Sequence, residues 1–468
     1  MTQFDNSYAR LPDRFFAHID PDPVDAPEMI LFNDALADSL GVTERDAAVF
    51  AGNVIPEGAA PLAQVYAAHQ FGGWVPRLGD GRAILLGEVV TETGRFDIQL
   101  KGAGRTPYSR NGDGRAWLGP VLREYIVSEF MAACGVPTTR ALAAVATGER
   151  VQRERAYPGG VLTRVAASHI RVGTFQYFTA QEDAEAVRLL AGHVRDRHYP
   201  QARTMLDLYR EIVAAQALLV ARWMGLGFVH GVMNTDNTSI AGETIDYGPC
   251  AFIDAYAPNA CYSSIDRNGR YAFDQQASIA GWNLAQLGTC FVGMITEETG
   301  SQDAAIEALT EVLNGFPALY QSAWRDVFAA KLGIVTPRDG DEDLAQDLLT
   351  MMAAQYADFT NVFARLGTET ARDEFTDRPA FDAWAARWHA RRDRGAEGAD
   401  LMARANPQVI PRTHRLEAAI VAATEGDFTK AQRLARVLSA PFAVADTDRD
   451  LMAPPSRDEI VPATFCGT

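Results

Sequence analysis

The chain is poor in lysine and cysteine, and it has no long hydrophobic run. No apolar segment approaches the length of a membrane-spanning helix, and the first residues lack the apolar core of a signal peptide. The five cysteines show neither CxxC pairs nor zinc-ligand spacing. A net charge of −17 disfavours general binding to nucleic acid or acidic membranes. These absences predict a cytoplasmic protein without nucleic-acid or membrane partners, and we expect a monomer.

Lysine is the rarer of the two basic residues: only three occur, at positions 101, 331 and 430, among 43 basic residues. A chain that uses arginine for most surface charges retains lysine where a compact ammonium group is needed. Lys101 ends the alternating, strand-like run 95–101. Between Arg95 and Arg171, twelve basic residues stand against six acidic ones. This basic segment predicts a pocket for a polyanion such as a nucleoside triphosphate, whereas the alternative is a chance cluster of solvated arginines.

The polar stretch 230–248, HGVMNTDNTSIAGETIDYG, contains Asp236, Asn237 and Asp246 within eleven residues. The run between them predicts a tight β-hairpin, which would place an amide or carboxylate at its start beside the carboxylate at its end. Two oxygen ligands on a rigid backbone suit Mg²⁺ when phosphate oxygens and waters complete the octahedron. The alternative is a polar loop whose Asn and Asp side chains only shape turns.

Further candidates lie upstream. The sequence LGDGR at 78–82 predicts a tight turn whose backbone N–H groups suit phosphate, although Gly-Asp-Gly is also an ordinary hairpin turn. A loop rich in Gly, Arg and Ser spans 101–117, and its length indicates function. Apolar spacing predicts a helix over 117–134 that carries Glu124. This carboxylate either faces solvent or pairs with Lys101 and holds the ammonium group toward a phosphate.

Two arginines, Arg164 and Arg171, lie seven residues apart in apolar, strand-like sequence. Arginines in such surroundings are harder to explain as surface residues than those in polar segments. A guanidinium group binds phosphate oxygens through two parallel hydrogen bonds. We therefore expect both side chains to contact phosphate.

The hydrophobic patterning predicts an α+β fold. The entry segment is expected to be irregular, with helices near 33–40 and over 61–74. Strands are expected over 83–90, 95–101, 141–147, 160–165 and 170–178. Further helices are expected over 181–199, 204–224, 276–296, 302–313, 316–331, 342–365, 378–392, 414–424 and 428–438.

This order of elements is the layout of the protein-kinase fold, in which a strand lysine and a helix glutamate precede a polar catalytic loop. We therefore expect a protein-kinase-like, two-lobed fold with a β-rich N-lobe and a helical C-lobe. The expected division is an N-terminal extension (1–75), the N-lobe (76–180), the C-lobe (181–440) with its catalytic loop (228–250), and a C-terminal tail (441–468).

Several longer motifs resemble one family, the selenoprotein O family (SelO, also called YdiU). The resemblance covers essentially the whole chain. QLKGAGRTPYSR and HGVMNTDN are its most specific motifs. The other matching motifs are LGDGRAILLGE, GVPTTRAL, RVAASHIRVG, IDYGP and NPQVIPR.

The resemblance implies a protein adenylyltransferase with a pseudokinase fold, which transfers AMP from a flipped ATP to Ser, Thr or Tyr hydroxyls of protein substrates. ATP would be the nucleotide substrate, and Mg²⁺ or Mn²⁺ the metal. By the same resemblance, Lys101 matches the family's phosphate-binding lysine and Glu124 its helix partner, and Asp236 matches the proton acceptor. Arg164 and Arg171 match the arginines that hold the γ-phosphate. The metal ligands match Asn237 and Asp246, and the remaining nucleotide contacts match Gly79, Gly81, Arg82, Asp113 and Gly114.

The chain departs from a phosphoryl-transferring kinase at Val232, the position two residues after the histidine where a kinase has its base. A kinase-type phosphotransferase and a non-catalytic ATP-binding sensor therefore remain alternatives. Cys466 stands where some family members have selenocysteine. The resemblance implies a regulatory disulfide between Cys261 and Cys466, and the alternative is two unrelated thiols.

Overall fold

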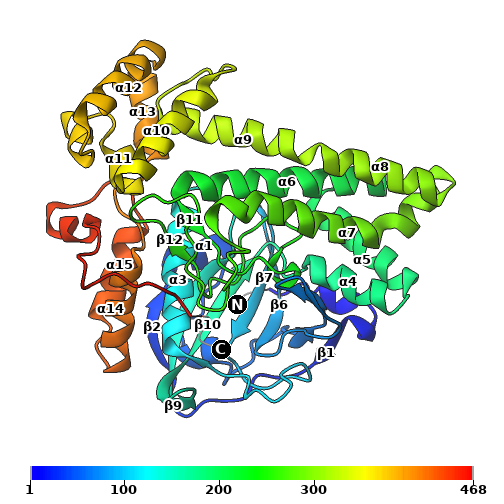
Figure 1. Cartoon of the computed structure of the whole chain (residues 1–468). Helices are drawn as coiled ribbons and strands as arrows, with labels where there is room; N and C mark the ends of the chain where they lie inside the picture. The colour runs from blue at the N-terminus through cyan, green and yellow to red at the C-terminus, as the bar shows by residue number, and fades with distance from the viewer. Residues whose placement is uncertain (1–2, 394, 466–468) are drawn as a thin grey trace.

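The computed structural model describes residues 3–393 and 395–465, and it shows a mixed α and β protein (Figure 1). Most of the strands come before residue 167, and most of the helices come after it. The predicted α+β class is therefore confirmed.

Eight strands form one sheet, in which β1, β3, β6, β7, β10, β9 and β2 follow one another and β8 pairs with β10. Adjacent strands of this sheet run antiparallel to each other. Lys101, the last residue of β7, lies at the centre of the sheet, opposite Ala83 in β6 and Leu162 in β10. The bounds are β1 Phe16–His18, β2 Glu28–Phe32, β3 Leu62–Gln64, β6 Ala83–Thr91, β7 Gly94–Lys101, β8 Ala116–Trp117, β9 Arg140–Gln152 and β10 Ala156–Ala166.

The two faces of the sheet carry different side chains because successive residues of a strand point to opposite sides. Ile98 and Leu100 of β7 join the core beneath α1 (Asp34–Leu40) and α2 (Ala47–Ala51). The opposite face of the sheet packs against α3 (Leu118–Ala133). This alternation directs Lys101 toward α3.

The helical part begins with α4 (Val172–Ala180) and α5 (Ala184–His198). The long helix α6 (Met205–Leu226) packs against α7 (Gln276–Thr299) and α9 (Phe316–Lys331), and Figure 1 shows the three side by side above the sheet. The predicted capping box at the start of α6 is present: Thr204 Oγ1 accepts a hydrogen bond from Asp207 N, and Asp207 accepts one from Thr204 N. The remaining bounds in this part are α8 Gln302–Asn314, β11 Phe228–Val229 and β12 Ala251–Phe252.

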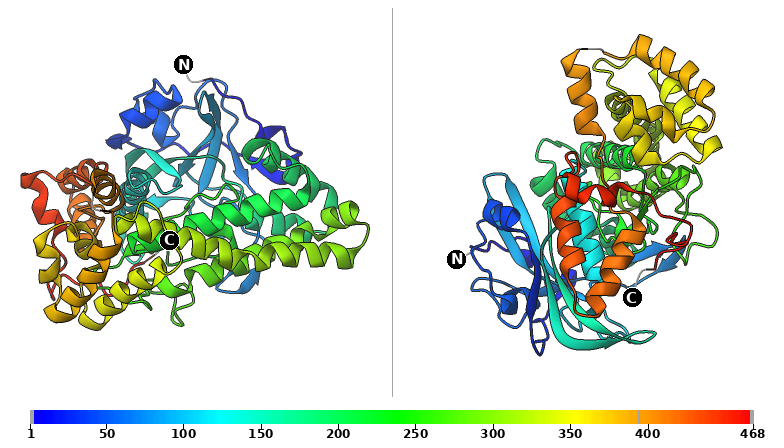
Figure 2. Two further views of the ribbon diagram at one scale, coloured as in Figure 1. Left: turned by 90° about the horizontal axis from the view of Figure 1, so that it is seen from above. Right: turned by 90° about the vertical axis from the view of Figure 1, so that its left-hand side faces the viewer.

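The last third of the chain forms two groups of helices. The first group comprises α10 (Asp341–Gln355), α11 (Phe359–Arg365), α12 (Arg378–Arg391) and α13 (Ala396–Ala405), and it shares a second hydrophobic core with Phe328 and Ala329 of α9. The second group, α14 (Thr413–Thr424) and α15 (Thr429–Leu438), packs against α3, as the right-hand view of Figure 2 shows. The end of the chain thus supports a helix that lies against the central sheet.

The helix predicted over 61–74 is wrong. This segment forms β3, then β4 (Ala68–Gln70) and β5 (Gly73–Val75). Phe71 and Gly72 both have positive φ, 51° and 81°, so the chain reverses in a two-residue turn. Pairing of β3 with β1 and β6 overrides the helix propensity of the alanines in the sequence.

Other element predictions also need correction. The strand predicted over 170–178 is wrong, because α4 begins at Val172; Thr174 Oγ1 accepts a hydrogen bond from Arg171 N at 3.1 Å at the first turn of this helix. The single helix expected over 342–365 is two helices, because Tyr356 adopts a φ of 55° after α10. α13 was not predicted.

The sequence predicted no membrane-spanning segment and a disulfide between Cys261 and Cys466. Within the described ranges, no helix combines the length and apolarity needed to cross a membrane. Cys466, the predicted disulfide partner of Cys261, lies outside the described residues, so this pairing stays a prediction. Thr464 pairs with Ser263, which brings the tail to the loop that contains Cys261.

Arg412 joins the helical part to the tail and is 1% exposed. Its guanidinium group donates to Asp358 Oδ2 at 2.8 Å and Oδ1 at 3.1 Å, to Asp254, and to the carbonyl oxygen of Met452 at 3.1 Å. Removing the cation would leave Asp358 buried without its charge partner.

We expect Arg412→Met to lower the free energy of unfolding by about 3–5 kcal/mol, because breaking a buried ion pair strands a charge. Urea unfolding followed by circular dichroism measures the change. The control is Arg372→Met, since Arg372 makes a similar two-bond pair with Asp382 on the surface; its effect should be much smaller, because water screens an exposed ion pair. Equal effects of the two substitutions would contradict this account of the Arg412 pair.

Candidate functional site

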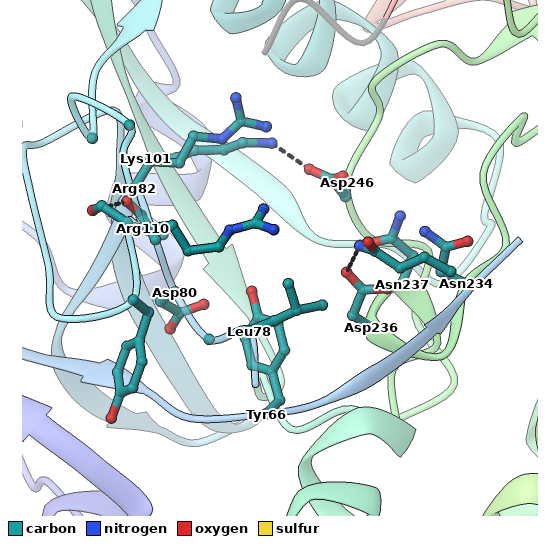
Figure 3. Close-up of a pocket in the computed structure, with 18 of the residues that line it drawn as sticks. Tyr66, Leu78, Asp80, Arg82, Lys101, Arg110, Asn234, Asp236, Asn237 and Asp246 are labelled. Atoms are coloured by element: carbon teal, nitrogen blue, oxygen red, sulfur yellow. Dashed lines mark hydrogen bonds and ion pairs between the residues drawn. The ribbon is translucent and has the colours of Figure 1, made fainter. Parts of the chain in front are cut away.

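A cleft of about 740 Å³ lies between the sheet and the segment 232–246, and it collects the predicted site residues (Figure 3). Its volume falls within the range of small-molecule sites. Glu124 is the one predicted site residue that does not line the cleft. Those that do are Gly79, Gly81, Arg82, Lys101, Asp113, Gly114, Arg164, Arg171, Asp236, Asn237 and Asp246.

The centre of the site is a buried group of two cations and two anions. Lys101 Nζ lies 2.7 Å from Glu124 Oε2 and also pairs with Asp246 Oδ1. Arg164 Nε donates to Glu124 Oε1 at 2.8 Å, and Arg164 Nη2 lies 3.5 Å from Asp246 Oδ1. The expected pairing of Lys101 with Glu124 is therefore present. Glu124 holds both cations from behind the cleft.

The neighbouring cations lower the pKa values of the two carboxyl groups, Glu124 and Asp246. Burial alone would raise the pKa of Glu124, but Arg164 and Lys101 outweigh it and hold the pKa below its ordinary value. Burial opposes ionisation of Asp246 as well, and Lys101, Arg164 and Arg82 hold its pKa far below the usual range. Both carboxyl groups are therefore ionised at neutral pH.

Asp246 adopts a φ of 65°, a left-handed conformation that is uncommon outside glycine. Strained backbone of this kind is typical of residues whose side chains are held for a function. Asp246 lines the cleft, and the hydrogen bonds that it accepts from Lys101 and Arg164 in the described part of the chain both go to Oδ1. Its Oδ2 is thus available to a ligand.

Across the cleft from Lys101, a short 3₁₀ turn (Thr235–Asn237) presents Asp236 and Asn237, as Figure 3 shows. Asn237 Nδ2 donates to the carbonyl oxygen of Val232 at 3.0 Å, which leaves the amide oxygen for a ligand. The hairpin expected between Asp236 and Asp246 is wrong. Its two arms pair elsewhere, Ser239 with Arg171 and Thr244 with Thr138.

Asp236 has one bonded and one orphan oxygen. Its Oδ2 accepts a hydrogen bond from Gln70 Nε2 at 3.1 Å, while its buried Oδ1 has no partner among the described residues. Burial raises the pKa of Asp236 to about 6, with Arg171 and Gln70 opposing the rise and Asp246 adding to it. A carboxylate with a pKa close to the working pH suits a general base.

Arg171 is held by a residue that sequence reasoning missed. Asp80 Oδ1 lies 3.2 Å from Arg171 Nη1, and Asp80 Oδ2 accepts hydrogen bonds from Gln64 N at 3.1 Å and Gln99 Nε2 at 3.3 Å. The ring of Tyr66 lies under the guanidinium group, 4.3 Å from ring centroid to Cζ. The only signal for Asp80 was its place between two glycines of LGDGR.

The glycine turn is packed tightly beneath the loop 102–115. A Cβ on Gly79 would lie 2.6 Å from the Tyr108 ring, and one on Gly81 would lie 2.9 Å from Tyr108 O. A Cβ on Gly114 would lie 2.0 Å from Gly104 O. These glycines allow backbone segments to approach one another closely, and this approach shapes one wall of the cleft.

Asp113, a predicted nucleotide contact, is paired with protein in this structure. Its carboxylate lies 2.9 Å from Arg153 Nη1 and accepts a hydrogen bond from Arg115 N at 3.0 Å. Burial raises the pKa of Asp113, but Arg153 and Arg115 N outweigh it and lower the pKa. Further lining residues that were not predicted include Gln70, Arg105, Arg110 and Asn234. Arg110 and Asn234 lie in motifs already singled out, whereas Gln70 carried no signal.

No three His, Cys, Asp or Glu side chains in residues 3–393 and 395–465 form a metal cluster by themselves. Asn237 and Asp246 nevertheless offer an amide and a carboxylate oxygen to one cleft, beside the orphan Oδ1 of Asp236. Hard divalent cations bound with phosphates need only one or two such protein ligands. The residues present fit Mg²⁺ or Mn²⁺.

Arginines and a lysine facing carboxylate and amide oxygens across one cleft are typical of enzymes that transfer phosphoryl or nucleotidyl groups. The family model described as "Protein adenylyltransferase SelO" matches residues 1–439, and the chain belongs to this family. It is thus an ATP-dependent nucleotidyltransferase, as the sequence predicted.

Curated relatives match this chain over 99% or more of their length. A "Protein nucleotidyltransferase YdiU" of Ruegeria pomeroyi is 57% identical, with 99% of each chain covered. The protein of the same name from Jannaschia sp. is 56% identical, again with 99% of each chain covered. That from Agrobacterium fabrum is 52% identical over both complete chains.

We expect Lys101→Ala to lower the rate of nucleotidyl transfer on the order of 10²–10³-fold, the usual effect of losing one positioned electrostatic contact. Glu124→Gln should cost less, because Lys101 would keep its contact with Asp246. Transfer from α-labelled ATP measures the rates, and thermal unfolding checks the fold. Lys430→Ala, at an exposed lysine, is the matched control. Wild-type rates for Lys101→Ala would contradict the assignment of this site.

Glu243 lies between the two predicted metal ligands in the sequence, and its burial predicts a pH dependence of stability. Its Oε2 accepts a hydrogen bond from Ala167 N at 3.0 Å, and burial raises its pKa from 4.5 to about 8. The folded state therefore binds a proton that the unfolded state releases at lower pH. Its stabilising contribution is complete below pH 4.5 and is lost as the pH rises to about 8.

Glu243→Gln imitates the protonated side chain and should remove this pH dependence. We expect the variant to be more stable than the wild type at pH 8 by about 1–3 kcal/mol, with little difference near pH 5. Urea midpoints at several pH values measure this, and the exposed Glu425→Gln is the control. Parallel pH profiles for wild type and Glu243→Gln would show that Glu243 ionises normally.

Proposed function

We propose that this chain transfers AMP from ATP to Ser, Thr or Tyr hydroxyls of protein substrates and releases pyrophosphate. The observation that carries the proposal is the cleft itself, where Lys101, Arg164 and Arg171 face Asp236, Asn237 and Asp246. The family name gives the group transferred and the class of acceptor.

In this proposal the cations of the chain bind the triphosphate. Lys101, held by Glu124, contacts phosphate oxygens as a compact charge, and Arg164 and Arg171 hold the γ-phosphate. Both arginines are already oriented by carboxylates, Arg164 by Glu124 and Arg171 by Asp80. Preorganised charges of this kind need no rearrangement when negative charge develops.

Asn237 and Asp246 would hold Mg²⁺ or Mn²⁺, which when bound neutralises phosphate charge. Asp236 accepts the proton of the acceptor hydroxyl through its orphan Oδ1. The hydroxyl oxygen forms a bond to the α-phosphorus, and the bond from that phosphorus to the bridging oxygen breaks. Pyrophosphate leaves with the bonding electrons, and the proton remains on the carboxylate.

We further propose the kinase-like, two-lobed division into residues 1–75, 76–180, 181–440 with a catalytic loop at 228–250, and 441–468. The pairing of a central-strand lysine with the glutamate of the following helix supports it. Val232 occupies the sequence position of the kinase base, two residues after His230, and it lines the cleft but cannot accept a proton. This favours adenylyl transfer with Asp236 over a kinase-type phosphotransferase.

The experiment that tests the proposal uses ATP labelled at either the α or the γ phosphate, with an extract from cells that lack this chain as the source of acceptors. We expect protein to retain the α label and not the γ label, with alkali-stable AMP on Ser, Thr or Tyr found by mass spectrometry. Chelation of divalent cations with EDTA should abolish labelling, and added Mg²⁺ or Mn²⁺ should restore it.

The alternatives give different results. Label retained only from γ-labelled ATP would identify a phosphotransferase. A thermal shift with ATP and Mg²⁺ but no label from either nucleotide would identify a non-catalytic sensor. Asp236→Asn, which keeps shape but not basicity, should bind ATP normally and lose transfer.

A further inference from the structure

The hairpin of β4 and β5 lies at the mouth of the cleft and is attached to the turn that presents Asp236. His69 N donates to Thr235 Oγ1 at 2.7 Å, and Phe71 N donates to Asn234 Oδ1 at 3.1 Å. Gln70 Nε2 reaches Asp236 Oδ2 itself. The position of the hairpin is thus fixed relative to the proposed base.

The tip of this hairpin has an unfavourable sequence. Phe71 and Gly72 both have positive φ, as in a type I′ turn, whose first position favours Asn, Asp or Gly. A bulky aromatic residue in this conformation is strained. Burial does not explain it, because Phe71 is 36% exposed and its main ring contact is with Tyr271, at 5.0 Å between centroids. The fold alone gives no reason for phenylalanine here.

The exposed ring of Phe71 belongs to a continuous set of ring contacts, because Tyr271, against which it packs, also lies under Arg270, with Cζ 5.7 Å from the ring centroid. Trp74, 41% exposed, packs on His69 at 4.9 Å between centroids, and His69 packs on Trp282 at 5.3 Å. Arg270 lies over Trp282, with Cζ 4.9 Å from the ring centroid. We call Phe71, Trp74, Trp282 and Arg270 the aromatic rim. Aromatic residues and arginine are enriched at the centres of protein interfaces.

We propose that the aromatic rim binds the acceptor protein through a large apolar side chain, aromatic or aliphatic, close in sequence to the modified hydroxyl. Phe71 lines the cleft, so the rim is continuous with the site that an acceptor hydroxyl must enter. Phe71 directly follows Gln70, whose amide contacts Asp236. An acceptor segment that approaches Asp236 along this hairpin passes over the rim. This inference rests on the proposed function, because it assigns the specificity of the same site.

The test uses short synthetic peptides with one central Thr among Ala, Gly and Lys, and with a single Phe or a matching Ala within a few residues of the Thr. The wild-type enzyme should transfer α-labelled AMP to the best Phe peptide on the order of tenfold faster, in kcat/KM, than to its Ala counterpart. Anisotropy of the same peptides with a fluorescent label measures binding without turnover.

The informative variant is Phe71→Asn. Asparagine suits the positive φ of this turn, so the variant protein should keep or raise its melting temperature. It should lose the preference for the Phe peptide, on the order of tenfold in kcat/KM. Trp74→Ala, outside the turn, should reduce the preference too. Tyr356→Asn is the matched control: Tyr356 is also aromatic, has a φ of 55° and is 80% exposed, but does not line the cleft.

Equal transfer to Phe and Ala peptides, unchanged by Phe71→Asn, would contradict acceptor binding by the aromatic rim and would leave the proposed adenylyl transfer unaffected. Phe-dependent binding that Phe71→Asn abolishes, with no α label on any peptide, would support the rim and refute the proposed activity. A change of oligomeric state in Phe71→Asn, seen by light scattering, with unchanged transfer would assign the rim to self-association and overturn the proposal.

Discussion

The buried group of Lys101, Glu124, Arg164 and Asp246 is the interaction on which the site depends. It joins two central strands, the helix α3 and the loop after β11 at one point. Two positive and two negative charges balance there, which reduces the cost of holding them away from water. Because each carboxylate contacts both cations, displacing one member leaves the other three poorly compensated. The group thereby couples the sheet to the polar loop that carries Asp236 and Asn237.

The parts of this site that could be predicted had a local signal. Lys101 stood out because lysine is rare in the chain, and Glu124 because it lies on a helix of otherwise apolar pattern. Asn237 and Asp246 stood out by their polar stretch. Arg164 and Arg171 stood out as arginines in apolar, strand-like sequence. The role of Asp236 came only from the resemblance of longer motifs, since spacing alone does not assign a proton acceptor. The helices α3, α6, α7, α9 and α12 were predictable because their apolar periodicity is strong.

The parts that were missed depend on contacts between distant segments. Nothing in the sequence of residues 61–75 reveals that β3 pairs with two other strands or that Phe71 adopts a positive φ. Gln70 and Asp80 therefore had no visible role, although each orients a charged residue of the cleft. The hairpin expected before Asp246 failed for the same reason, because its arms pair with segments near Arg171 and Thr138. Tertiary pairing overrides local preference at these positions.

The supports of the cleft come from late parts of the chain. α14 and α15 pack against α3, where Arg123 pairs with Glu417 beside Glu124. Thr464 N donates to Tyr262 O at 2.7 Å, in the loop whose Tyr271 donates to Asn234 Oδ1 at 2.7 Å. A nascent chain on the ribosome that ends before residue 413 therefore lacks both supports, although it already contains every residue of the cleft. The cleft therefore receives its last packing contacts only from segments that are synthesised after all of its lining residues.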